Sequence, residues 1–144
     1  MSNRLRNSLY GTLRFSGITG LWRWLHRKSI TIVYIHGVKA DGQGAGKEPT
    51  RAHMSVEVLD RQLEVLTRKY EFVDLDSAIE MLSGRSEMGN NCALFTIDDG
   101  YRNAWELAWP VLQKHNVPAS VYIPTANMKS GEMFWWDQVD YVLL

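Results

Sequence analysis

One short segment of the chain is apolar at five of six positions and then ends in two carboxylates. It spans Cys92 to Ile97, with Thr96 as its one polar residue, and Asp98 and Asp99 follow directly. A strand without polar alternation is typical of a parallel sheet, because helices cover both faces of such a sheet. The segment therefore predicts an α/β fold with this strand in its core.

Strand and helix patterns alternate along the rest of the chain. The predicted strands are Ile30–Ile35, Phe72–Leu75, Cys92–Ile97 and Pro118–Ile123. The predicted helices are Val56–Tyr70 capped by Ser55, a short one from Asp76 to Leu82, Trp105–Leu112, and Met133–Leu144. This order predicts parallel β/α units with right-handed crossovers, in either an open doubly wound sheet or part of a barrel.

The sequence also predicts a kink, two core residues and a loop. Pro110 should kink its helix or start the second half of it, because proline has no N–H to donate. Trp105 and Trp109 lie at helical spacing, which predicts that they belong to the core. Residues 39–51 are rich in glycine and are interpreted as a loop.

Composition excludes several classes of protein. Lys+Arg and Asp+Glu both number 16, so a nucleic-acid binder driven by phosphate neutralisation is not expected. The single cysteine rules out an internal disulfide. No apolar run approaches the roughly 18 residues of a membrane span, and no signal-peptide pattern is seen. The chain is therefore expected to have no transmembrane segment and to be cytoplasmic.

Residues 1–29 form a basic N-terminal segment without acidic residues. It is either an amphipathic helix resting on a membrane surface or a helix covering one end of the fold, with Trp22 and Trp24 in the core. The second interpretation is favoured here, because Gly11, Gly17 and Gly20 interrupt the helical pattern.

The acidic pair is the main candidate site. Asp98 and Asp99 follow a strand, where working residues of parallel folds lie, and Gly100 allows a sharp turn beside them. Adjacent carboxylates repel each other unless a cation or a proton relieves them. One carboxylate would bind a divalent metal while the other moves a proton. The structural alternative is that one Asp caps the helix near Tyr101 and the other is solvated.

Several motifs in order resemble the polysaccharide deacetylases, carbohydrate esterase family 4. Phe95–Tyr101 resembles the family's Thr-Phe-Asp-Asp-Gly-Tyr signature, with Ile97 in place of the usual Phe. Ile32–Val38 resembles the first strand, with one residue inserted before His36. Val117–Pro124 and Phe134–Asp137 resemble two later segments, so the resemblance covers Ile30 to Leu144.

The resemblance implies the N-terminal portion of a distorted (β/α) barrel that deacetylates N-acetylated polysaccharide or oligosaccharide, hydrolysing a non-peptide C–N bond. Asp98 would be the general base and Asp99 a ligand of a divalent metal, commonly zinc, which lowers the pKa of its bound water. His36, Tyr101 and Trp135 would contact substrate, with the backbone amide of Tyr101 at the oxyanion. The alternative for His36 is a histidine that is hydrogen-bonded at a strand end and has no role in substrate binding. At least one of Trp135 and Trp136 is expected to belong to the core.

The chain departs from the family's pattern at the metal site. The family uses His-x-x-x-His after the acidic pair, and this bacterial-type sequence has no such spacing among His26, His36, His53 and His115. His26 and His53 are interpreted as surface or packing residues, and His115 as a solvent-facing histidine at a helix end. Residues 30–144 are therefore expected to be a truncated domain with little or no activity alone.

Two other functions remain open. The chain is a non-catalytic half-barrel that binds carbohydrate or associates with another chain through an exposed sheet edge, or a phosphoryl-transfer domain of receiver or dehalogenase type. The second needs Lys and Ser/Thr partners at later strand ends, and Ser120 and Lys129 do not fit the required order well.

Overall fold

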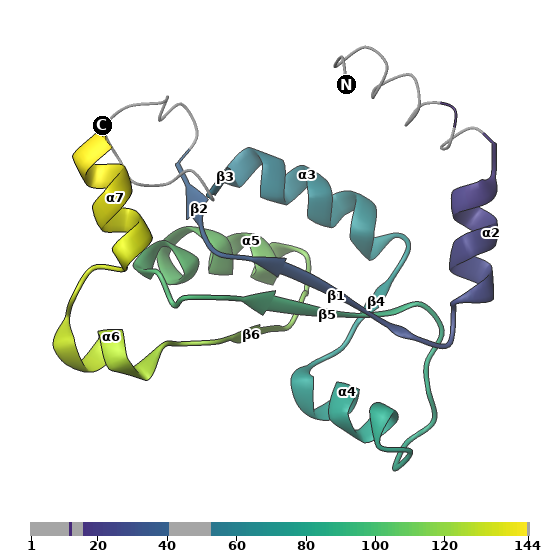
Figure 1. Cartoon of the computed structure of the whole chain (residues 1–144). Helices are drawn as coiled ribbons and strands as arrows, with labels where there is room; N and C mark the ends of the chain where they lie inside the picture. Colours follow the sequence, from purple (N-terminus) through teal and green to yellow (C-terminus); the bar gives the residue numbers. More distant parts are fainter. Residues whose placement is uncertain (1–11, 13–15, 41–52, 144) are drawn as a thin grey trace.

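A parallel four-stranded sheet forms the centre of the molecule (Figure 1). The computed structural model describes residue 12, residues 16–40 and residues 53–143. Strand β5 (Cys92–Ile97) pairs along its whole length with β1 (Ile30–Ile35). The other edge of β5 pairs first with β4 (Glu71–Phe72) and then with β6 (Ala119–Val121). All of these pairings are parallel, which confirms the predicted α/β class.

Strand β5 is buried at every position, as its composition predicts. Helix α3 (Val56–Thr67) and the η1–α5 segment, residues 104–114, lie over one face of the sheet, and α4 (Leu75–Leu82) lies on the other side (Figure 1). The core lies between β5 and the helices on the first of these faces, α3 and the η1–α5 segment. Its buried members are Ile35, Val38, Leu59, Leu63, Phe95, Ile97, Ala104, Ala108, Val111, Leu112 and Val117.

The helix starts follow local capping chemistry. Ser55 caps α3 as predicted, since its side-chain oxygen accepts from the backbone N–H of Val58. Helix α4 starts earlier than predicted. Asp74, rather than Asp76, is its cap, and its Oδ1 accepts from the N–H of Ser77 at 2.7 Å. Because the cap lies at 74, β4 ends at Phe72 and is shorter than the predicted strand.

The helix over residues 104–114 changes character in the middle. A π-helical turn, η1 (Ala104–Ala108), leads into α5 (Trp109–Lys114), with Pro110 in the first turn of α5. Proline donates no backbone hydrogen bond, so it starts the second half as predicted. The core assignment of Trp105 is wrong: its side chain is 72% exposed. The smaller Ala104 and Ala108 face the core instead.

Four further elements lie outside the four-stranded sheet and its covering helices. Strands β2 (Val38–Lys39) and β3 (Met54–Ser55) form a separate parallel pair. Helix α6 (Thr125–Ser130) precedes α7 (Trp135–Leu143), which matches the predicted last helix. Most of the predicted glycine-rich loop, residues 41–52, lies outside the described residues.

Helix α2 (Ile18–Leu25) differs from its expected role. None of its residues is buried, and Trp22 and Trp24 are 64% and 58% exposed. The interpretation that these tryptophans enter the core is therefore wrong. Within the described residues, no helix is both long enough and apolar enough to cross a membrane.

Candidate functional site

The carboxyl ends of β1 and β5 bring His36 and the acidic pair to one rim. The strand register pairs Ile35 with Ile97, so the next residues, His36 and Asp98, leave the sheet side by side. The backbone N–H of Asp98 donates to the carbonyl of Ile35 at 2.9 Å and holds this arrangement. The placement of His36 beside the acidic pair is as the parallel strands predict.

The backbone turns sharply directly after Asp98. Asp99 and Gly100 both have left-handed conformations, with φ of 69° and 66°. Asp tolerates this region better than most residues, and Gly adopts it without a steric penalty. A Cβ at position 100 would lie 3.1 Å from Cγ1 of Ile123, so the turn is also closely packed. The left-handed turn therefore begins at Asp99, directly after Asp98, the residue that follows the strand.

A buried hydrogen-bonded pair ties α7 to this rim. The Tyr101 hydroxyl donates to Oδ2 of Asp137 at 2.7 Å and accepts from Nε1 of Trp136 at 3.0 Å. Asp137 is buried, and the contact joins residues that lie 36 positions apart in the chain. Burial and the acceptor Asp137 raise the pKa of Tyr101, whereas the Trp136 hydrogen bond opposes this. The phenol is therefore a neutral donor at physiological pH.

His53 joins the site, although the sequence places it only among surface or packing residues. Its side chain is 8% exposed, and its ring meets that of Tyr101 edge-on with centroids 4.7 Å apart. Burial lowers the pKa of His53, while the charges of Asp137 and Asp99 raise it and that of His36 lowers it. The charge of Lys39 also lowers the pKa of His53, so His53 lies within electrostatic range of both acidic and basic groups.

Gly37 makes room for His53. Nδ1 of His53 lies 3.0 Å from Nδ2 of Asn103, and a Cβ at position 37 would lie 2.7 Å from both His53 Nε2 and Asn103 Oδ1. Asn103 Oδ1 is buried without a hydrogen-bond partner, which is uncommon in a folded protein. No sequence motif singles out His53, because its position depends on the pairing of β2 with β3.

The described side chains do not form a complete metal-binding set. Among residues 16–40 and 53–143, no group of three or more His, Cys, Asp or Glu side chains is placed to hold a metal ion. A structural or catalytic zinc ion takes at least three protein ligands. The residues described here therefore do not fit a resident metal by themselves.

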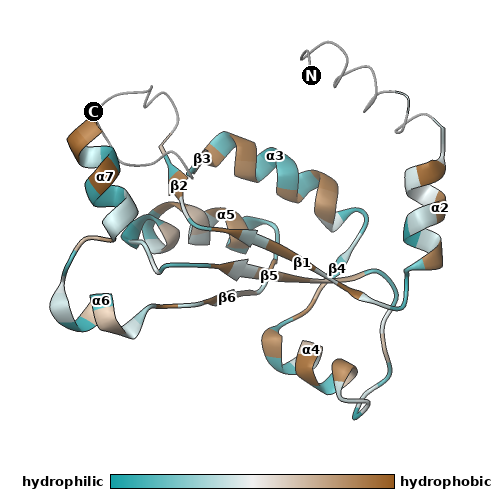
Figure 2. Ribbon diagram, viewed as in Figure 1, coloured by the Kyte–Doolittle hydropathy of each residue, from teal (hydrophilic) through white to brown (hydrophobic). Residues whose placement is uncertain are grey.

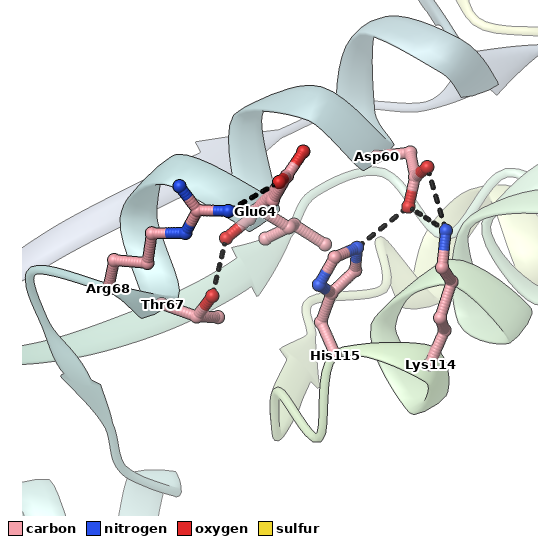
Figure 3. Close-up of polar contacts among 7 residues, drawn as sticks. Asp60, Glu64, Thr67, Arg68, Lys114 and His115 are labelled. Atoms are coloured by element: carbon pink, nitrogen blue, oxygen red, sulfur yellow. Dashed lines mark hydrogen bonds and ion pairs between the residues drawn. The ribbon is translucent and has the colours of Figure 1, made fainter.

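His115 has a structural role that its position did not predict (Figure 3). It is partly buried, and its Nε2 lies 2.7 Å from Oδ1 of Asp60 on α3, so the solvent-facing interpretation is wrong. Lys114 Nζ donates to the same carboxylate at 2.8 Å. Both contacts lower the pKa of Asp60. Figure 3 shows that this cluster joins the end of α5 to α3, beside the Glu64–Arg68 pair.

The paired tryptophans at the start of α7 are more exposed than expected. Trp135 and Trp136 are both exposed, so the prediction that at least one belongs to the core is wrong. Trp136 stacks on Phe134 with ring centroids 4.8 Å apart, and its indole N–H is used by Tyr101. Trp135 meets Trp136 edge-on, and Trp135 itself remains largely exposed to solvent.

Comparison with known proteins agrees with the motifs. Residues 85–142 match the family model of the polysaccharide deacetylases. IcaB from Ammonifex degensii superposes with a TM-score of 0.57 at 25% identity, covering 65% of this chain and 37% of IcaB. No match was found among the curated proteins.

Two further solved structures share the fold. A de-N-acetylase from Aggregatibacter actinomycetemcomitans has a TM-score of 0.55 at 21% identity, covering 64% of this chain and 36% of its own. The deacetylase PplD of Streptococcus pyogenes has a TM-score of 0.55 at 19% identity, covering 72% and 45%. The chain thus spans less than half the length of these proteins. The resemblance to the polysaccharide deacetylases is confirmed in sequence over residues 85–142 and in fold over 65% of the chain.

Proposed function

We propose that the chain contributes two carboxylates, Asp98 and Asp99, to a site that deacetylates N-acetylated polysaccharide. The observation that carries this proposal is the position of Asp98 and Asp99 at the carboxyl rim of β5, beside His36. Active sites of parallel β/α folds lie at this rim. The proteins with the same fold include deacetylases, and the acidic pair lies inside the matched residues.

The two carboxylates have different roles in this proposal. Asp98 leaves a fully buried strand and is held by its own backbone hydrogen bond to β1, so it is positioned to take a proton from an attacking water. Asp99, which starts the left-handed turn, would be a ligand for a divalent metal, with zinc as the expected ion. No His-x-x-x-His occurs in the sequence. Metal binding by this chain alone is therefore weak and its activity low.

Aromatic groups beside the rim supply the sugar-binding surface. Trp135 is exposed, and Tyr101 is fixed by Trp136 and Asp137. Exposed aromatic rings with a polar edge suit contacts with the apolar face and hydroxyls of a sugar ring. His36, on the same rim, is a further substrate contact.

NMR and an acetate-release assay with an N-acetylglucosamine oligomer and added Zn²⁺ test this function. We expect the oligomer to shift NMR resonances of His36, Tyr101 and Trp135, with acetate release near background because the ligand set is incomplete. Asp98→Asn should keep the oligomer shifts, and Asp76→Asn on α4 is the control, since Asp76 is another aspartate but lies away from the rim.

Two results would contradict different parts of the proposal. An oligomer that leaves the rim resonances unchanged would contradict the carbohydrate role. Strong acetate release that disappears in Asp98→Asn, but not in Asp76→Asn, would support the role of Asp98 and contradict the expectation that this chain alone has low activity.

A second candidate function is association with another chain through the edge of β6. On this side Val121, Tyr122 and Ile123 are exposed, and a cavity of about 350 Å³ lies between β6 and the η1–α5 segment. Trp105 and Trp109 stack beside it with parallel rings, 6.2 Å between centroids. Such an apolar strand edge favours pairing with a further strand.

Sedimentation velocity at several protein concentrations tests this association. We expect dimers or larger species that dissociate in Val121→Lys, because a charge on an edge strand opposes pairing. Lys129→Ala on α6 is the control. A wild-type chain that remains monomeric at every concentration would contradict the association.

A further inference from the structure

Helix α2 presents an apolar stripe to solvent. Ile18, Leu21, Trp22 and Leu25 recur at spacings of three and four, which places them on one side of a helix. All four are exposed, as is Trp24 on the flank of the stripe. Single exposed apolar residues are ordinary, but five on an eight-residue helix form a continuous patch that marks an interaction surface.

The inner side of α2 is not packed into the fold. An open cavity of about 780 Å³ lies between α2 and α3; Ile18 and Trp22 of the stripe line it from α2, and Val65 and Lys69 line it from α3. Figure 2 shows brown, apolar segments on α2 although the helix stands beside the domain rather than over its sheet. Ile18 and Trp22 therefore face an open space rather than a packed core, and no residue of the stripe is buried.

Charge is strongly divided along the chain. Residues 1–40 contain seven of the 16 basic residues and no Asp or Glu, so the remaining residues hold nine basic against 16 acidic ones. Arg23 lies on α2, and Arg27 lies over the Trp24 ring at 4.8 Å from its centroid. An anionic surface would attract this end of the molecule and repel the rest.

We propose that α2 is a docking helix for an anionic lipid surface. Tryptophan favours the membrane–water interface, and neighbouring arginines bind lipid phosphate. An apolar stripe with basic flanks and no acidic residue is the pattern of a helix that lies in the plane of that interface. A protein groove would also accept the stripe, but a neutral groove offers nothing to the excess of cations beside it.

The docking helix lies at the opposite end of the sheet from the acidic pair. Helix α2 leads into the start of β1, whereas Asp98 and Asp99 follow the end of the parallel strand β5 (Figure 1). A chain bound through α2 therefore directs its carboxylate rim away from the lipid. This inference does not depend on the proposed deacetylation.

Vesicle co-sedimentation of the full chain tests the docking helix. We expect the chain to bind phosphatidylcholine vesicles that contain phosphatidylglycerol at least about tenfold more tightly than pure phosphatidylcholine vesicles, and to be released by high salt. Trp22→Ala/Trp24→Ala and Arg23→Ala/Arg27→Ala should each lower this binding by about tenfold or more. Circular dichroism verifies that the variants remain folded.

Matched controls separate the helix from general effects of hydrophobicity and charge. Trp105→Ala removes an equally exposed tryptophan outside α2, and Arg85→Ala/Lys129→Ala removes two exposed cations elsewhere. These variants should bind as the wild type does. Equal binding by the α2 variants, equal loss in the controls, or a wild-type chain that stays in the supernatant would overturn the proposal. So would a concentration-dependent dimer that Trp22→Ala/Trp24→Ala dissociates, because the stripe would then cover a second copy.

Discussion

Phe95→Ala should lower the free energy of unfolding by about 3–5 kcal/mol, the usual loss for a buried aromatic residue. Phe95 is 1% exposed in the central strand, where the register places Val33 on one side and Ala119 on the other. Its ring lies 6.3 Å from that of Phe72. The substitution leaves a cavity between the sheet and the helices, at the one strand that every other strand of this sheet contacts.

A loss of this size is a large fraction of the roughly 5–15 kcal/mol that stabilises a typical domain. Urea denaturation of the wild type and the variant measures it. Tyr34→Ala is the matched control, because Tyr34 lies on the adjacent strand but is 62% exposed, so we expect a loss below about 1 kcal/mol. Similar losses in both variants would show that β5 is not the centre of the core.

Local patterns in the sequence were sufficient to predict the two long strands of the central sheet. The apolar run of β5 predicted burial on both faces, and the β-branched run from Ile30 to Ile35 predicted a second strand, which pairs with β5 in the structure. Both signals come from consecutive residues, so no tertiary information is needed to detect them. The rim positions of Asp98 and His36 follow, because parallel strands end on the same side.

Residues whose position depends on distant contacts could not be predicted in this way. His53 reaches the site through the short β2–β3 pairing and the space that Gly37 leaves. Asp137 meets Tyr101 only after the chain has passed through β6 and α6. Tyr101 and Asp137 both lie in segments that resemble family motifs, but neither motif indicates that the two side chains meet, and His53 lies in no motif.

Aromatic residues show a related difficulty. The spacing of Trp105 and Trp109 is helical, but spacing does not say which stripe of the helix faces inward. In the structure the inward stripe is formed by Ala104, Ala108 and Leu112, and Trp105 lies outside it. Small residues allow the helix to approach the sheet closely, and the bulky neighbour is left at the surface.

The second large effect concerns the metal-ligand role of Asp99. Paramagnetic Co²⁺ broadens or shifts NMR resonances near the place where it binds, so it locates even a weak site. We expect these effects to centre on Asp99, Gly100 and His36, and to need a high Co²⁺ concentration because the described residues do not complete a ligand set. Asp99→Asn should abolish them, since an amide is a much weaker ligand than a carboxylate for a divalent cation.

Asp60→Asn is the control for this titration, because Asp60 is another partly exposed carboxylate beside an imidazole, that of His115. Co²⁺ titration of the wild type, Asp99→Asn and Asp60→Asn, followed by NMR, tests the metal-ligand role of Asp99 most directly. For this role we expect paramagnetic effects at the β5 rim that persist in Asp60→Asn and vanish in Asp99→Asn. Effects centred on Asp60 and His115, or rim effects unchanged in Asp99→Asn, would contradict it.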